Sequence, residues 1–276
     1  MRILSIALVV AGLLTTAASA AGQPSVPYDH VHLAVADPEK AEAWYTANLT
    51  GNVGENPGRV AFQPWSNRAP LPIQFIFLKA EDAKPSEGSV IDSVGFVVQG
   101  LEAKVKVLEA AGATLRQPVE SVPGLGKHAV VVDPWGTKIE LVESRDRPGF
   151  HHITLRVSNP EESIRWYVRS FGGERTKLGG RLDAVKYGNT YLIVTRGDAT
   201  TPSRGRAIDH LGFGPRSMDA TAADLKTKGV AFTAEPAAKP NQFGHRTAYV
   251  EDPTGVRIEL VEHAQCAAGQ ASRESR

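Results

Sequence analysis

The chain has 276 residues, a formal net charge of +1 and a single cysteine. This length holds one large or two small domains, and the scattered Lys and Arg residues form no basic face for nucleic acid. Cys266 cannot form an internal disulfide. Its place in a polar C-terminal tail, 264–276, which we expect to be disordered, excludes it as a catalytic nucleophile.

Residues 1–20 have the pattern of a secretory signal peptide. A basic start is followed by the apolar segment ILSIALVVAGLL, which is too short to span a bilayer, and Ala18 and Ala20 precede the expected cleavage site. We expect cleavage between Ala20 and Ala21, so that the mature chain is periplasmic or secreted and has no membrane attachment. The alternatives are an uncleaved anchor or a wrongly assigned start codon.

The remaining chain repeats itself. Three pairs of segments share their residue patterns at nearly the same spacing: YDHVHLAVADPEKAEAWYTANLTG (28–51) with FHHITLRVSNPEESIRWYVRSFGG (150–173), VIDSVGFVV (90–98) with AIDHLGFGP (207–215), and DPWGTKIELVES (133–144) with DPTGVRIELVEH (252–263). Matched segments at one spacing predict a duplication into two halves, 28–144 and 149–263.

Each half divides again into two similar units. The first unit opens with HVHLAV or HITLRV, whose alternating polar and apolar residues predict a strand with one buried face. Asp/Asn-Pro-Glu then begins a helix that runs through Trp-Tyr, and further strands follow. The second unit opens with an Ile-Asp strand, continues into a helix (101–112 or 218–229) that ends at a glycine, and closes with strands. The chain is therefore expected to contain four βαβββ modules in an α+β fold.

These motifs resemble the vicinal oxygen chelate superfamily, which includes glyoxalase I, bleomycin- and fosfomycin-resistance proteins, methylmalonyl-CoA epimerase and extradiol catechol dioxygenases. The resemblance covers about 28–263 and rests on H-x-x-L-x-V, Trp-Tyr and a late D-P-x-G-x-x-x-E. It implies two tandem glyoxalase/dioxygenase-like domains whose paired modules form cups around a divalent metal. The simplest pairing joins the first module to the second and the third to the fourth. A swapped pairing is left open, and it decides whether His30 meets His210.

Strand alternation directs three polar side chains of the second half to one concave side. Because the apolar residues of each strand face the helices, His152, His210 and Glu259 face the cup. These are the ligand positions that the resemblance implies, and two imidazoles with a carboxylate suit Fe, Mn, Ni, Co or Zn. We predict one divalent ion there. The alternative is a cup that keeps these residues for hydrogen bonding.

The corresponding positions of the first half are His30, Gln74, Ser93 and Glu140. Serine replaces the second histidine, so we expect this half to hold no working metal site. Glu140 is then expected to be a residue retained from the duplicated motif, with His30 as its partner. The nearby His32 and His128 could compensate, and that alternative stays open.

Two further residues are candidates for proton transfer. Tyr249 stands where the resemblance to extradiol dioxygenases implies a substrate-contacting tyrosine, although an ordinary strand aromatic explains it equally well. His245 is a candidate acid/base because imidazole titrates near pH 7. It lies closer to Tyr249 than the family pattern has it.

The sequence thus predicts an exported, divalent-metal-dependent enzyme whose small-molecule substrate chelates the metal through two oxygens, as a lyase, isomerase or extradiol-type dioxygenase. The alternative is a non-catalytic binding protein of the bleomycin-resistance type. That type has an aromatic-lined cleft at a dimer interface, for which Phe62 and Trp65 are candidates and a homodimer is an open expectation. A third hypothesis is a structural or interaction protein with vestigial cups.

Overall fold

The computed structural model describes residues 26–54, 56–65, 72–145, 148–198 and 201–264. The predicted signal peptide lies outside the described residues, as does the predicted tail apart from its first residue. Within these ranges, no helix combines the length and apolar character needed to cross a lipid bilayer.

The predicted βαβββ order is present in all four modules. The first contains β1 (Tyr28–Val35), α1 (Pro38–Asn48), β2 (Asn52–Val53), β3 (Arg59–Trp65) and β4 (Pro72–Lys79). The second contains β5 (Ile91–Val98), α2 (Leu101–Ala110), β6 (Thr114–Val122), β7 (Gly126–Val132) and β8 (Lys138–Glu143). The third contains β9 (Gly149–Val157), α3 (Pro160–Phe171), β10 (Glu174–Leu178), β11 (Leu182–Tyr187) and β12 (Thr190–Arg196). The fourth contains β13 (Ile208–Phe213), α4 (Met218–Thr227), β14 (Phe232–Ala234), β15 (Arg246–Glu251) and β16 (Arg257–Glu262).

Polar residues start three of the helices. The Asp37 side chain accepts a hydrogen bond from the backbone N–H of Lys40 at α1, and Asn159 and Ser217 cap α3 and α4 in the same way. Each cap satisfies one of the N–H groups that the first turn of a helix leaves without a partner. The expected helix starts at Asp/Asn-Pro-Glu are therefore confirmed.

The repeated Asp-Pro-x-Gly motif is a turn that leads into the last strand of each half. Asp252 Oδ1 accepts hydrogen bonds from the backbone N–H groups of Thr254 and Val256, at 2.8 and 2.9 Å, and Gly255 adopts a φ of 94°. Only glycine adopts this left-handed conformation without strain. Asp133 forms the same turn at the end of the first half. The motif thus has a structural role in both halves.

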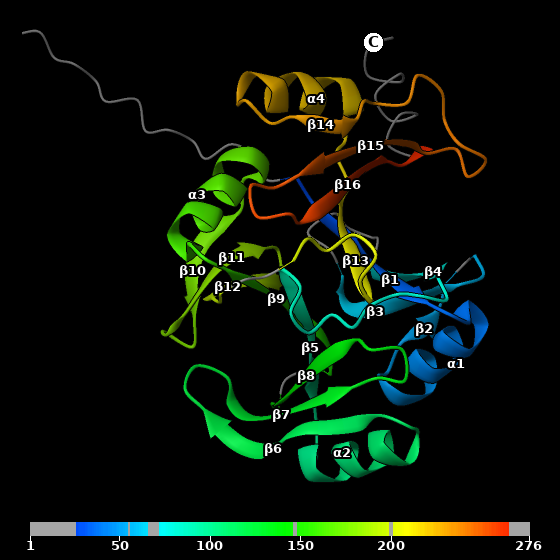
Figure 1. Ribbon diagram of the computed structural model, residues 1–276, viewed down its shortest axis with the longest axis vertical. Coiled ribbons are helices and arrows are strands. Elements are labelled where there is room, and N and C mark those ends of the chain that lie inside the picture. Colours follow the sequence, from blue (N-terminus) through cyan, green and yellow to red (C-terminus); the bar gives the residue numbers. More distant parts are fainter. Residues whose placement is uncertain (1–25, 55, 66–71, 146–147, 199–200, 265–276) are drawn as a thin grey trace, which may run out of the picture.

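The modules pair across the two halves. The first sheet has the strand order β14-β15-β16-β13-β1-β4-β3-β2, and the second has the order β10-β11-β12-β9-β5-β8-β7-β6. Module 1 therefore shares a sheet with module 4, and module 2 shares one with module 3 (Figure 1). The simplest expected pairing is wrong. The short connection from β8 to β9 keeps modules 2 and 3 adjacent, whereas residues 80–90 and 197–207 connect one sheet to the other.

We name the sheets by their central antiparallel strands, as the β1–β13 cup and the β5–β9 cup. Aromatic residues fill the core where the two sheets meet. Phe62 and Phe75 of the β1–β13 cup contact Phe96 of the β5–β9 cup at ring-centroid distances of 5.1 and 5.6 Å. Phe62, a candidate for the wall of an aromatic cleft, is fully buried in this core, while the side chain of Trp65 lies outside the described residues.

Candidate metal centre

Four metal-ligating residues converge on the floor of the β1–β13 cup. His30 and His32 lie on β1, His210 on β13 and Glu259 on β16, and one ligand atom from each lies within 4.8 Å of all the others. The register explains the cluster, because His32 pairs with His210 across the β1–β13 ladder. Residues two apart on a strand share a face, so His30 joins them.

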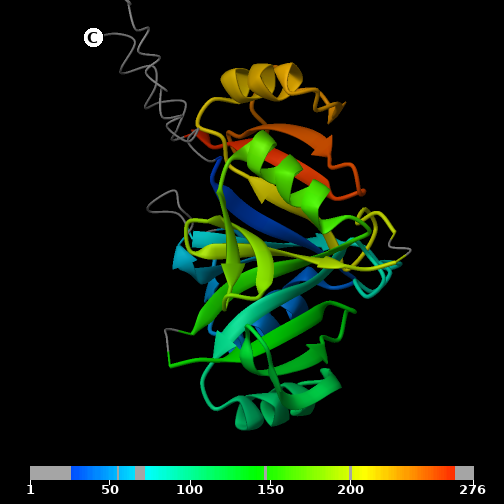
Figure 2. The same cartoon turned by 90° about the vertical axis from the view of Figure 1, so that its left-hand side faces the viewer.

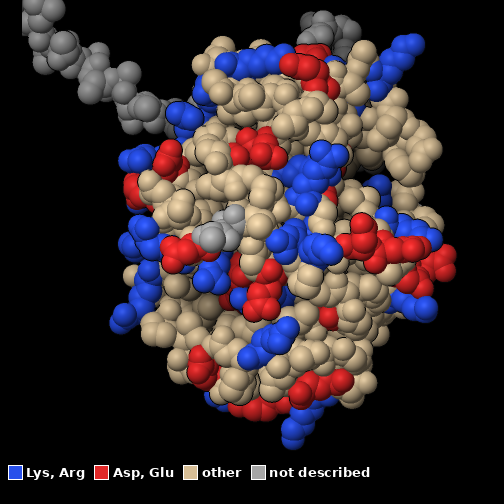
Figure 3. All heavy atoms as spheres, in the orientation of Figure 1, with Lys and Arg blue, Asp and Glu red and all other residues tan. Residues whose placement is uncertain are grey.

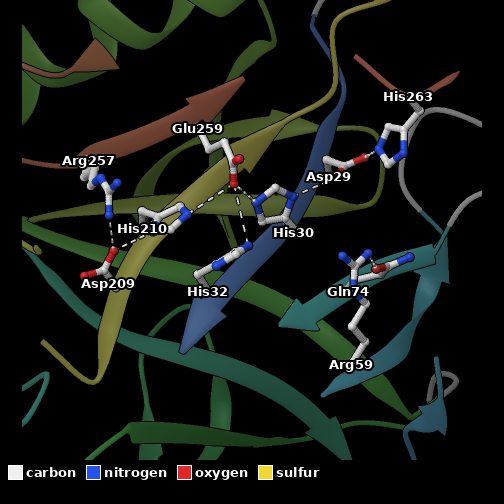
Figure 4. A network of polar contacts seen from close by, with 10 residues as sticks. All are labelled: Asp29, His30, His32, Arg59, Gln74, Asp209, His210, Arg257, Glu259 and His263. Carbon is white, nitrogen blue, oxygen red and sulfur yellow. Dashed lines mark hydrogen bonds and ion pairs between the residues drawn. The ribbon is translucent and has the colours of Figure 1, made fainter. Parts of the chain in front are cut away.

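The three imidazoles direct the same nitrogen at one carboxylate oxygen. The Nε2 atoms of His30, His210 and His32 lie 3.1, 3.3 and 3.6 Å from Glu259 Oε2 (Figure 4). All four residues come from strands of a single sheet, which fixes their relative positions. The arrangement is a compact set of donor atoms around one small space.

Two aspartates hold two of the imidazoles from behind. Asp29 Oδ2 accepts from His30 Nδ1 at 2.8 Å, and Asp209 Oδ1 accepts from His210 Nδ1 at 2.5 Å. Carboxylates in this position hold a proton on Nδ1 of a histidine ligand and orient its Nε2 toward the metal, so an ion in the cluster would take the place of any proton on Nε2. Each aspartate has a cationic or imidazole partner of its own, Arg257 for Asp209 at 2.8 Å and His263 for Asp29 at 2.9 Å.

The charges of the cluster are strongly coupled. Burial alone would raise the pKa of Glu259, but hydrogen bonds from His210 and His30 outweigh it and hold that pKa far below its usual range. Burial opposes protonation of His30, and its contacts with Asp29 and Glu259 nevertheless raise its pKa to about 9. Glu259 is therefore ionised at neutral pH. The hydrogen bonds from the imidazoles offset the desolvation that a lone buried charge would suffer.

The donor set fits a divalent transition metal. Burial and the neighbouring His210 and His30 lower the pKa of His32, so its imidazole is neutral and can act as a ligand. Its Nδ1 atom is buried and has no hydrogen-bond partner among the described residues. Neutral imidazoles with one carboxylate are the ligands that Fe, Mn, Co, Ni and Zn accept in proteins.

A cavity of about 450 Å³ opens above His30, His32 and Glu259. Arg59 and Gln74 lie on one wall, where Arg59 Nη1 donates to Gln74 Oε1 at 3.4 Å, and the Arg59 guanidinium stacks on the ring of Phe243 at 5.4 Å. The cup can therefore receive a small molecule next to the cluster, with a cation and amide groups beside it.

The structure places both predicted proton-transfer residues near the cluster. Tyr249 pairs with Glu259 in the β15–β16 register, and its ring lies 5.7 Å from the ring of His210. His245 lines the cavity and contacts the ring of His263 at 4.6 Å. Burial and the nearby His263 lower the pKa of His245, and burial with the neighbouring Glu259 raises the pKa of Tyr249.

The predicted grouping of His152 with His210 and Glu259 needs correction. The structure brings His210 and Glu259 together, but His152 lies on β9 in the other cup because module 3 pairs with module 2. There its Nε2 lies 3.5 Å from Glu140 Oε2. The position beside His210 is occupied by His30 and His32, and Gln74 of the predicted first-half set lies next to His30 in the β1–β4 register.

The β5–β9 cup contains a closed hydrogen-bond cluster. Glu140 Oε1 accepts from the hydroxyls of Ser93 and Thr154, and Glu140 Oε2 accepts from His128 Nε2 at 3.0 Å. Ser93 and Thr154 pair across the β5–β9 ladder where His210 and His32 pair in the other cup. Two potential ligands are thus replaced by hydroxyl groups, and the carboxylate is satisfied without a metal. Glu140 accordingly belongs with His128 and His152, and not with the expected His30.

The sequence groups His30 and His32 with the first half, in which it predicts no working metal site. One signal could have joined His30 to His210. Each is preceded by an aspartate, at Asp29 and Asp209, whereas His152 is preceded by His151. The Asp-His pair is the sequence trace of a histidine ligand with a backing carboxylate.

The chain thus combines paired βαβββ modules with a candidate metal centre inside a curved sheet. Three imidazoles and a carboxylate form that centre on the floor of the cup. Residues 149–260 match the Glyoxalase/Bleomycin resistance protein/Dioxygenase superfamily. The predicted resemblance is confirmed over this part of the chain, which matches that superfamily, the vicinal oxygen chelate superfamily.

Named relatives agree with this assignment. A protein of Vibrio cholerae named "probable lactoylglutathione lyase" is 28% identical over 129 residues, which cover 43% of this chain and 93% of the relative. A chloroplastic protein of the same name from Arabidopsis thaliana is 25% identical over 192 residues, covering 64% of this chain and 54% of the relative. The solved structure of glyoxalase I from Zea mays superposes with a TM-score of 0.68 at 17% identity, over 88% of this chain and 94% of that one, and so shares the fold.

Proposed function

We propose that the chain is a divalent-metal-dependent enzyme, a lyase or isomerase of the glyoxalase type, acting on a small molecule that offers two neighbouring oxygens. The observation that carries the proposal is the convergence of three imidazole Nε2 atoms on Glu259, with Asp29 and Asp209 hydrogen-bonded to Nδ1 of two of them. The names of the Vibrio and Arabidopsis relatives support a lyase.

The residues of the cup have separable roles in this proposal. His30, His210 and Glu259 hold the ion, and His32 is the fourth donor. A bound ion would supply Lewis-acid polarisation of the two substrate oxygens. His245 is half-buried on the cavity wall with a lowered pKa, so its neutral imidazole can accept a proton from a substrate in the cavity.

Arg59 indicates which charge the substrate carries. Among the described residues it forms no ion pair with a carboxylate, and it lines the cavity beside Gln74. A guanidinium in this place favours substrates with an anionic group at one end.

An extradiol-type dioxygenase is the second candidate. Two histidines and a carboxylate form the facial triad of non-haem Fe(II) oxygenases, and Tyr249 lies beside His210 and Glu259. A third outcome is a metal-binding protein that sequesters a small molecule without turnover. Export through residues 1–20 belongs to the proposal, and an N-terminal sequence of the secreted protein beginning at Ala21 would support it.

The test is the metal content and affinity of the purified protein after Fe, Mn, Co, Ni and Zn have each been offered. Wild type should retain close to one ion per chain, and His210→Ala should weaken binding at least about 100-fold, because a primary ligand is lost. Screening catechols against adducts of α-ketoaldehydes with thiols then separates a dioxygenase from a lyase.

The β5–β9 cup supplies the matched control. His152→Ala removes the histidine that occupies the corresponding strand position, and it should leave the metal content unchanged because His152 contacts Glu140. Failure of wild type to bind any of these ions would overturn the proposal. Loss of metal in His152→Ala, with retention in His210→Ala, would place the ion in the β5–β9 cup and contradict the assigned ligands.

A further inference from the structure

A second cavity lies on the outer side of α3, away from the metal-ligating cup. Its volume is about 630 Å³, and it is lined by six residues of α3, by Arg175 of β10 and by Pro253 of the β15–β16 turn. The α3 residues are Glu162, Ile164, Arg165, Trp166, Val168 and Arg169. We name it the α3 groove. Figure 2 shows α3 on the face of the molecule turned toward the viewer, beside β16. The groove shares no lining residue with the cavity above His30.

The other half of the chain shows what fills the same junction. Trp44 of α1 corresponds to Trp166 of α3, and the turn that faces α1 reads Asp-Pro-Trp-Gly where the turn facing α3 reads Asp-Pro-Thr-Gly. The ring of Trp135 stands edge-on to the ring of Trp44, at a centroid distance of 6.2 Å and an interplanar angle of 87°. In the sequence of the turn, Thr254 takes the place of Trp135, so the turn whose Pro253 lines the α3 groove carries no aromatic ring.

The junction at α3 also carries more basic residues than the junction at α1. Ala43 and Ala47 of α1 correspond to Arg165 and Arg169 of α3. Figure 3 shows basic side chains along the left-hand edge of the molecule, over α3 and β10, with acidic side chains between them.

The three arginines at the groove are unequally paired. Glu161 pairs with Arg175 at 2.5 Å and approaches Arg165 at 3.9 Å. Arg169 forms no ion pair or hydrogen bond among the described residues. The rim of the groove therefore carries guanidinium charge that a ligand can neutralise.

We propose that the α3 groove binds a small anionic aromatic molecule. The ring occupies the space that Trp135 fills beside α1 and packs against Trp166 and Pro253, and a carboxylate on the ring pairs with Arg169 and Arg165. An aromatic ring prefers the edge-on contact seen between Trp44 and Trp135, and guanidinium groups bind carboxylates with two parallel hydrogen bonds. Apolar walls with a few convergent charges are the usual composition of a small-molecule site.

The test uses indole-3-acetate as the anionic aromatic probe and neutral indole as its uncharged counterpart. Calorimetry and the NMR signal of the Trp166 indole N–H are followed in metal-free protein, so that no ion in the cup can hold the carboxylate. Saturable binding of indole-3-acetate, with indole at least about tenfold weaker, is expected because the arginines contribute only to the anion. Arg169→Met should remove most of this difference.

Substitutions in the two Asp-Pro-x-Gly turns provide the matched pair. Thr254→Trp fills the groove with the residue of the other half and should abolish binding of the probe. Trp135→Thr should open a corresponding space beside Ala43 and Ala47 that accepts indole and shows no preference for its acetate. Should Thr254→Trp fail to fold, Arg169→Met decides alone.

Three results would overturn the proposal. They are absence of saturable binding at millimolar probe, equal binding of the probe by wild type and Arg169→Met, and loss of binding in Arg59→Met. The last result would place the probe in the metal-ligating cup.

Discussion

Glu140 and Glu259 stand at the same position of the same motif, and different partners compensate for their burial. Three imidazoles face Glu259, and hydroxyls with two imidazoles face Glu140. Burial tends to raise the pKa of Glu140, but hydrogen bonds from His128, His152 and Ser93 outweigh it and hold that pKa well below its usual value. Glu140 is therefore ionised in the folded protein and stabilises it.

Glu140→Gln is expected to lower the free energy of unfolding at pH 7 by about 2 kcal/mol, because charge-assisted hydrogen bonds become neutral ones. An acid whose pKa is lowered on folding stabilises the folded state above its unfolded pKa, near 4.5, and loses this effect as the pH falls. The difference in the free energy of unfolding between wild type and Glu140→Gln should thus become smaller as the pH falls below 4.5. Urea unfolding at several pH values measures it. A difference that widens with acidity would contradict the assignment, and Glu102→Gln, in an exposed pair with Lys127, is the control.

Single residues explain how far the site could be predicted from the sequence. Strand alternation placed His210 and Glu259 on one concave face, and the structure shows them 3.3 Å apart. It could not choose between His30 and His152, because both lie on first strands with the same alternation. Which of them meets His210 depends on an edge-to-edge contact between strands far apart in the chain, and local periodicity carries no information on that contact.

At the scale of elements, one of the two central strands of each cup, β13 or β5, has a glycine at the point where a histidine ring of the neighbouring strand lies against it. A Cβ atom on Gly212 of β13 would lie 2.1 Å from His30 Cε1, and a Cβ on Gly95 of β5 would lie 1.9 Å from His152 Cε1. The Ile-Asp-x-x-Gly-Phe pattern of these strands therefore reserves space for the imidazole of the antiparallel neighbour.

Gly212→Ala and Gly95→Ala should separate the two cups. Both substitutions crowd a buried ring and should each lower the free energy of unfolding by about 1–3 kcal/mol. Only Gly212→Ala displaces His30, so it alone should weaken metal binding, by about tenfold or more. Isothermal titration with Zn or Mn, alongside thermal unfolding, measures both effects. Equal loss of affinity in the two variants would contradict the division of roles between the cups.

The modules themselves were predictable from the sequence because their signals are local. Alternation marks the strands, and Asp37 and Asn159 cap helices where Asp/Asn-Pro-Glu predicted them. The pairing of modules was not predictable in this way. The central strands β1 and β9 present similar faces, as do β5 and β13, so that either pairing satisfies the hydrophobic pattern. The lengths of the segments between modules favour the observed pairing of modules 2 and 3, because the segment between β8 and β9 is the shortest of the three.

At the scale of the whole molecule, neither half contains a complete cup. β9 pairs with β5 and β13 pairs with β1, so each half supplies one strand to each central ladder. The candidate metal centre takes His30 and His32 from the first half and His210 and Glu259 from the second.

The second half alone, 149–263, should therefore not fold as a monomer, because β9 and β13 would both lose their central partners. If it folds, it should form a symmetric dimer in which β9 of one copy pairs with β13 of the other. That pairing would bring His152 next to His210 and Glu259. Light scattering with size-exclusion chromatography and metal analysis measures both properties. A folded monomer would contradict the expectation.

The cross-pairing also has a consequence for how the two sites can change by mutation. In a symmetric dimer of identical half-length chains, one codon specifies the same residue in both cups, so no substitution can alter one site and spare the other. Fusion of two copies gives each cup its own codons. Serine at position 93 and threonine at 154 stand where the other cup has histidines. Selection can thus preserve one centre while its twin becomes a purely structural support.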